Sequence, residues 1–284
     1  MGATVSRAIK IVALVIMAIG MLGGSPSSTM AADDSGGWRY TVQPYMWAPT
    51  IEMDLKLSAP NGSSGEPEIE IKPDDYLENL DIALIVTAMA RKGKWSFTAD
   101  FIYMEVSSKD NKLKRIDFGG PRVTTTLDEE VDVDVTSFIT TFGGGYQVID
   151  GPRLKMDVVV GLRYLWMEQD VDWELEADVD GPGPGQSFAR SGSVTEDGDV
   201  WDGIVGIRGE ILFGDGNWFI PFYADIGTGD SDLTWSVFSG IGYSFKDWFE
   251  AMIGYRHMEW DNDGNEVFQE VTLSGPVLGG RFNF

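Results

Sequence analysis

Few side chains in this sequence are of the kind that perform covalent chemistry. His257 is the single histidine and there is no cysteine, so thiolate metal sites and cysteine nucleophiles are excluded. A catalytic histidine needs an acid or a serine beside it, whereas Tyr255 stands two positions before His257. No phosphate-binding glycine loop, nucleophile elbow or zinc motif is present. The sequence therefore predicts no catalytic residues, no cofactor and no enzymatic activity.

Acidic residues gather in two stretches where they could coordinate a hard cation through oxygen atoms. The stretch 167–181 has seven acids and no base, and DNDGNE (261–266) places three acids around a glycine. The second stretch resembles part of a calcium loop but lacks the distant glutamate that completes one. We interpret both as solvated loops, with divalent cations left open as partners. The weak metal candidates are Asp261, Asp263 and Glu266.

Elsewhere, charged residues alternate with apolar ones. In LKMDVVVGLRYLW (154–166), the even-numbered positions are apolar, while Lys155, Asp157 and Arg163 share the odd-numbered set. In a β-strand the two sets point to opposite faces. Period two recurs along the whole chain and helical periodicity is almost absent, so an all-β protein is predicted. Ten segments read as strands, at approximately 38–57, 81–91, 95–107, 130–149, 153–177, 198–213, 217–227, 232–245, 249–260 and 267–284.

The connections between these segments alternate in length. This alternation is typical of an outer-membrane barrel, with short periplasmic turns and long extracellular loops. Long strands, and small residues on the face opposite the apolar one, favour this barrel over a soluble sandwich. We predict a single antiparallel transmembrane β-barrel of ten strands, with eight or twelve as alternatives, and one or two helical turns in Pro73 to Leu80. The predicted turns are 91–94, 150–153, 214–217 and 246–248; the predicted loops are 58–80, 109–129, 178–197, 261–266 and a short one at 228–231.

The first 32 residues have the layout of a cleaved secretory signal peptide. Arg7 and Lys10 precede an apolar run, Ile11 to Gly24, which is too short to span a membrane comfortably as a helix. Small residues follow, and cleavage is expected near Ala32. We therefore predict a signal peptide at 1–32 and a barrel domain at 33–284, located in the outer membrane of a Gram-negative cell.

The chain is strongly acidic, with 45 acids against 21 bases and a formal net charge of −24. Loss of Arg7 and Lys10 with the signal peptide would make it more so. Such a charge argues against nucleic-acid binding, which needs clustered positive residues. The 35 glycines and the 12% aromatic content suit strands and tight turns. Tryptophans near the segment ends, Trp260 among them, predict aromatic girdles at both membrane interfaces.

If the apolar set faces lipid, the alternate set faces the lumen. Seven bases and six acids then point inward, so the predicted interior is nearly neutral although the chain is acidic. Balance is expected because a buried charge without a partner is costly. Ten strands lie near the size at which side chains fill a barrel, so we expect at most a narrow path. The predicted lumen charge network is Arg39, Arg91, Asp100, Lys155, Asp157, Arg163, Asp202, Arg208, Glu210, Asp225, Glu250, Arg256 and Arg281. By the same parity, His257 faces outward near the outer interface.

Five stretches together resemble a group of small, mostly uncharacterised proteobacterial outer-membrane β-barrels with porin-like character. The resemblance implies a barrel and an outer-membrane location but no activity. Phe282 and Phe284 also resemble the C-terminal signal by which such proteins are passed to the barrel-insertion machinery. Omptin proteases are ten-stranded barrels too, but their Asp-x-His element is missing here. The stretches are WRYTVQPYMWAP (38–49), LENLDIAL (77–84), ARKGKWSFTADFIYMEVS (90–107), GLRYLW (161–166) and GPVLGGRF (275–282).

Two functional hypotheses follow, with an outer-membrane enzyme as a weaker third. The first is a structural or narrow porin-like channel for ions or small solutes, with a charge-balanced and largely filled lumen. The second is a surface interaction protein whose acidic loops bind cations or a partner. The expected partners are outer-membrane lipid, lipopolysaccharide and the insertion machinery, and we expect a monomer.

Overall fold

The computed structural model describes residues 37–55, 57–58, 64–65, 68–76, 80–111, 131–179, 186–262 and 268–284. The predicted signal peptide at 1–32 lies outside these residues. Among the described residues, no helix is long and apolar enough to cross a membrane.

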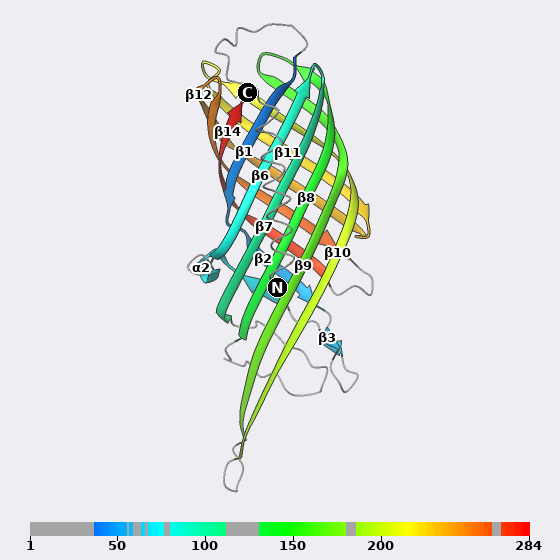
Figure 1. The fold of residues 1–284 in the computed structure, drawn as a ribbon, viewed down its shortest axis with the longest axis vertical. Helices are drawn as coiled ribbons and strands as arrows, with labels where there is room; N and C mark the ends of the chain where they lie inside the picture. Colours follow the sequence, from blue (N-terminus) through cyan, green and yellow to red (C-terminus); the bar gives the residue numbers. More distant parts are fainter. Residues whose placement is uncertain are drawn as a thin grey trace.

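Ten antiparallel strands close into a barrel (Figure 1). Each is hydrogen-bonded to the next in chain order from β6 to β14, and β1 pairs with both β6 and β14. Closure satisfies the backbone groups that an open sheet leaves at its edges. The structure confirms the predicted antiparallel barrel of ten strands. The barrel strands are β1 (Arg39–Trp47), β6 (Leu80–Lys92), β7 (Trp95–Asn111), β8 (Val131–Asp150), β9 (Leu154–Val179), β10 (Gln186–Phe213), β11 (Trp218–Gly229), β12 (Leu233–Lys246), β13 (Phe249–Asp261) and β14 (Phe268–Asn283).

The first predicted strand, 38–57, is two strands in the structure. β1 ends at Trp47 and β2 (Thr50–Leu55) begins after Pro49, which has no N–H to give to the ladder. The C-terminal half of β14 pairs with β1, and its N-terminal half pairs with β2. The prediction of one continuous strand is therefore wrong, although both pieces lie along the same partner.

The predicted loop 58–80 also contains regular structure. β5 (Glu68–Ile71) pairs with β2 and adds a further strand to the barrel sheet. A small pair, β3 (Leu57–Ser58) and β4 (Ser64–Gly65), stands apart from it. The predicted helical turn is present as α2 (Pro73–Tyr76). The short strands were missed because none is long enough to show a period.

The predicted loop 178–197 is wrong at its C-terminal end, because β10 begins at Gln186. Its residues 186–197 pair with β9 in continuous register, and the two strands extend well beyond the rest of the barrel (Figure 1). This part of β10 is rich in serine, glycine and acids, so its apolar alternation is lost. Pairing with β9, which sequence periodicity cannot report, makes it a strand.

Burial alternates along the barrel strands with period two. On β9, Val160 and Leu162 are 60% and 54% exposed, whereas the side chain of Arg163 is fully buried. The exposed apolar side chains form the outer face, and the charged ones point into the lumen. Aromatic rings cluster on the outer face, including the pair Tyr164 and Trp201 at 4.5 Å between centroids. The prediction that Trp260 belongs to an interfacial girdle is wrong, because this residue is 1% exposed and lies inside the barrel.

The interior has two unlike halves. Toward the tight turns, the inward positions carry charged and hydroxyl side chains. Toward the loops, many of them carry buried apolar side chains that pack into one cluster, while Asp202 and Ser231 form a buried polar pair at the same end. A polar interior was predicted along the whole barrel, so the apolar side chains at the loop end differ from that prediction. We name the central members of this cluster the apolar plug: Ile102, Met104, Leu165, Met167, Met258 and Leu273.

Glycines set the distance between some strands, and Gly161 offers a direct test. A Cβ on Gly161 would collide with the backbone of Phe142 and Gly143 on β8. Because a rotamer change cannot relieve a backbone clash, Gly161→Ala should lower the free energy of unfolding by about 1–3 kcal/mol. The matched control is Gly144→Ala on β8, where a Cβ meets nothing within 4 Å. Urea unfolding of both variants in lipid vesicles measures the difference, and equal losses would contradict the packing.

Candidate functional site

All thirteen residues of the predicted charge network stand at inward positions of the sheet register. They come from eight strands, which the closed barrel brings around one axis. The ion pairs and hydrogen bonds divide twelve of them into four groups.

In the first group, two arginines share one carboxylate. Oδ2 of Asp157 on β9 accepts hydrogen bonds from Arg91 on β6 and from Arg208 on β10, the latter at 2.9 Å. The Ser96 hydroxyl also donates to this oxygen, at 3.2 Å. Arg208 donates further to Ser96 at 2.9 Å and to Thr98. Two positive charges against one negative charge leave an excess of one positive charge in this group.

In the second group, Asp100 on β7 is surrounded by donors. Its Oδ1 accepts from Tyr45 at 2.9 Å and from Thr87 at 2.7 Å, and its Oδ2 pairs with Arg256 at 2.8 Å. Arg256 also donates to the Tyr45 hydroxyl at 2.5 Å. The guanidinium of Arg256 lies 5.4 Å from the ring centroid of Trp47, within cation–π range. This group is electrically balanced and ties β1, β6, β7 and β13 together.

The third group contains the most deeply buried ion pair. Arg163 on β9 and Asp225 on β11 approach to 2.5 Å, with side chains 0% and 1% exposed. Arg163 also donates to the Thr234 hydroxyl at 3.1 Å. Beside it, Asp202 accepts from the backbone N–H and the hydroxyl of Ser231, each at 3.0 Å. Hydrogen bonds of this kind allow charges to stay buried.

The fourth group lies nearest the tight turns and is partly exposed. Arg281 on β14 reaches Glu250 at 2.9 Å and Glu210 at 3.3 Å, and Lys155 reaches Glu210 at 3.4 Å. Two bases therefore meet two acids. The remaining predicted residue, Arg39, is exposed at the start of β1 and joins none of the four groups.

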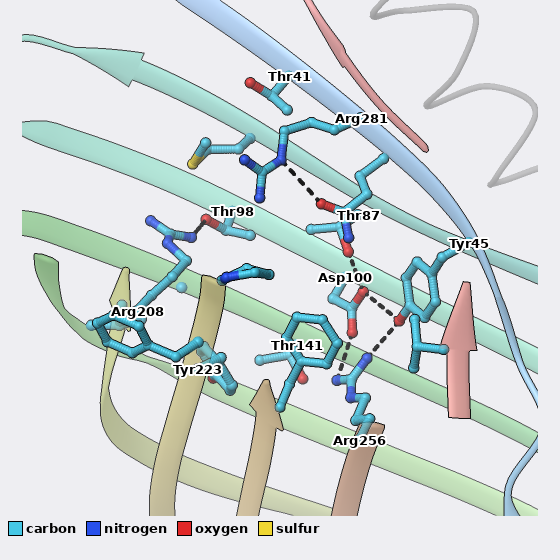
Figure 2. A pocket seen from close by; sticks show the side chains of 18 of the residues that line it. Thr41, Tyr45, Thr87, Thr98, Asp100, Thr141, Arg208, Tyr223, Arg256 and Arg281 are labelled. Carbon is cyan, nitrogen blue, oxygen red and sulfur yellow. Dashed lines mark hydrogen bonds and ion pairs between the residues drawn. The ribbon is translucent and has the colours of Figure 1, made fainter. Parts of the chain in front are cut away.

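A cavity of about 170 Å³ lies among these groups, on the turn side of the apolar plug. Arg208, Arg256 and Arg281 line it together with one acid, Asp100 (Figure 2). Thr141, a residue 9% exposed, also lines the cavity, and its buried hydroxyl has no hydrogen-bond partner among the described residues. The apolar part of the lining includes Met89, Val159, Pro221, Phe238 and Val277.

The uncharged members of the site were missed by the sequence argument. Tyr45, Thr87, Thr141 and Tyr223 line the cavity beside the predicted arginines. They stand at inward positions like the charged residues, so parity alone could have located them. A threonine or tyrosine at such a position, however, looks the same in sequence as one that only fills space.

His257 faces outward, the direction its parity predicts, and it contacts two groups that the sequence argument did not connect with it. Its Nδ1 lies 2.5 Å from Ser274 Oγ and its Nε2 lies 3.3 Å from Glu259, while its ring packs at a tilt against that of Trp235. A hydrolytic site would also need free N–H donors for an oxyanion. The backbone around Ser274 is engaged in strand pairing, with β13 on one side and β2 on the other. We therefore interpret His257, Ser274 and Glu259 as a polar group at the end of the apolar outer face.

Of the three weak metal candidates, the structure describes only one. Asp261 ends β13, and Asp263 and Glu266 lie outside the described residues. Among the residues that the structure describes, no group of three or more His, Asp or Glu side chains is placed to hold a metal ion. At the C-terminus, Phe282 packs against Phe249 with 5.3 Å between ring centroids, and the backbone of Phe284 pairs with β1.

Comparison with known proteins identifies the fold and nothing finer. No family model and no curated protein matches the sequence. The outer membrane protease OmpT from Escherichia coli matches with a TM-score of 0.53 and 10% identity, over 90% of this chain and 100% of that chain. The translocator domain of autotransporter NalP from Neisseria meningitidis matches with a TM-score of 0.34 and 14% identity, over 99% and 98%. The fold is that of outer-membrane β-barrel proteins, and at these identities no activity is transferred with it.

The buried pair of the third group should contribute most to stability. Arg163→Ala leaves Asp225 buried without its charge partner, so we predict a loss of about 3–5 kcal/mol in the free energy of unfolding. Arg281→Ala is the matched control, because its acids are partly exposed to water and the loss should be less than half as large. Urea titration in vesicles measures both variants. Similar losses for the two arginines would contradict the assigned burial.

Proposed function

We propose that the protein is an outer-membrane β-barrel that contains a narrow, gated passage for ions or small solutes. The observation that carries this proposal is the layered lumen, in which a charged cavity on the turn side ends at the apolar plug on the loop side. The outer face supports the location, because exposed apolar residues with aromatic clusters suit a lipid surrounding. The tight turns then lie in the periplasm and the long hairpin outside the cell.

The plug closes the passage in this conformation. Its six side chains are at most 3% exposed, and an apolar constriction of this kind excludes hydrated ions. Three of the six are methionines, whose unbranched side chains change rotamer more easily than branched ones. The plug can therefore rearrange while the barrel strands stay paired. The partly exposed fourth group admits solutes from the turn side as far as the cavity.

Conductance of the purified full chain in planar bilayers tests this proposal. Wild-type protein should show no steady open current. The double variant Met167→Ala, Met258→Ala removes side-chain volume from the plug, so it should conduct in discrete steps. The control, Val160→Ala with Leu162→Ala, makes comparable truncations on the outer face and should remain silent. If the plug variant folds to the wild-type barrel and still conducts nothing, the passage is wrong and the barrel is only structural.

The projecting hairpin favours a second candidate, a surface interaction through acidic segments. β9 and β10 pair with each other as far as Val179 and Gln186, whereas β11 pairs with β10 only from Asp202 onward. The stretch 167–181 is acidic, so a basic partner or cations would be its ligands.

Shortening this hairpin tests the second candidate. A chain in which residues 172–193 are replaced by a two-residue Asn-Gly turn should be retained less well on a polylysine surface at low salt than the full chain. Its conductance should not change. Unchanged retention of the shortened chain would contradict a role for the hairpin in binding.

A further inference from the structure

The charges around the cavity are not evenly balanced. Arg256 is matched by Asp100, and the fourth group has two bases and two acids. Arg208, however, shares the carboxylate of Asp157 with Arg91. Arg208 lines the cavity while Arg91 does not. A partly buried charge that lacks a full partner favours an anion within reach, so the excess positive charge of the first group is directed at this space.

A hydroxyl group beside Arg208 adds a directional donor. The Thr98 hydroxyl accepts a hydrogen bond from Arg208 and can give its own proton to a ligand. Figure 2 shows Thr98 against the guanidinium of Arg208, whereas Thr141 lies nearer to Asp100 and Arg256.

The rest of the cavity wall favours a ligand with an apolar body. Val159, Phe238 and Val277 contribute apolar surface to the cavity wall. At about 170 Å³, the cavity is below the roughly 300 Å³ at which pockets for drug-sized ligands begin. It therefore suits a single ring or a short chain. The plug closes the loop side, so such a ligand enters from the turn side.

We propose that the cavity is a binding site for a small carboxylate with an apolar body, which Arg208 holds by its charge and Thr98 holds by a hydrogen bond. The inference deepens the proposed function, since it names the solute class of the same lumen. It concerns equilibrium binding to the closed barrel and requires no current.

Calorimetric titration of the detergent-purified full chain with benzoate tests the site. Benzoate should bind saturably, while benzamide, which has the same shape without the charge, should bind at least tenfold more weakly. Benzylamine, which has the opposite charge, should not bind. Saturation by all three compounds, or by none of them, would overturn the inference.

Variants assign the binding to the named residues. Arg208→Gln should weaken benzoate binding by tenfold or more, and Thr98→Val, which keeps the shape of the side chain, by about threefold. Arg153→Gln removes an exposed arginine at a tight turn and should change nothing. Wild-type affinity in a folded Arg208→Gln barrel would overturn the assignment. The binding measurement uses no membrane, so it is independent of the conductance measurement. If the plug variant conducts but benzoate does not bind, only the inferred binding site is wrong. If benzoate binds but the plug variant does not conduct, only the proposed passage is wrong.

Discussion

Alternation of side chains between two surroundings is the constraint on which the whole structure depends. Along each barrel strand, every second residue meets the apolar outer face and the others meet the crowded interior. A shift of one residue between neighbouring strands would exchange the two sets, placing arginines outside and leucines within. Closure of β1 on β14 extends the constraint around the ring, because the register of each strand must agree with that of both neighbours.

The interior charges follow from this constraint. Inward carboxylates and guanidiniums are held away from bulk water, so they occur in groups with matched partners. The second and fourth groups are balanced, whereas the first has two bases for one acid and the third, with Asp202 beside Arg163 and Asp225, has one base for two acids. The acidic surplus of the chain is thus not a property of its lumen. A site inside the barrel therefore differs in charge from its surface.

Most of the fold could be predicted from the sequence, because period two and alternating connection lengths are local signals. Inward charged residues such as Asp100 and Arg256 could be placed for the same reason. Their partners could not, since Tyr45 reaches Asp100 across 55 positions of sequence. The plug was also missed. Met167 and Met258 share the inward parity, but the sequence of one strand does not show that other strands place apolar side chains at the same height in the barrel. The N-terminal extension of β10 could not be predicted either, because it forms by pairing with β9 and its own sequence has no period of two.

The layered lumen unites the fold with the proposed function. A barrel of ten strands is narrow enough for side chains to fill, and here the filling changes from charged to apolar along the axis. The charged part reaches toward water at the turn end and leaves a small cavity. The apolar part closes the loop end without breaking any strand pairing. Under the proposed function, passage through the barrel therefore depends on how firmly a few buried side chains stay in place.

The sidedness of β9 can be measured directly, because the chain has no cysteine of its own. Spin labels attached to single cysteines at successive positions from Met156 to Tyr164 report collisions with oxygen, which dissolves in lipid, and with a water-soluble nickel complex. In vesicles, labels at even positions should collide with oxygen and not with nickel, and those at odd positions should show little oxygen contact. Oxygen contact that fails to alternate, or that peaks at the odd positions, would contradict the account.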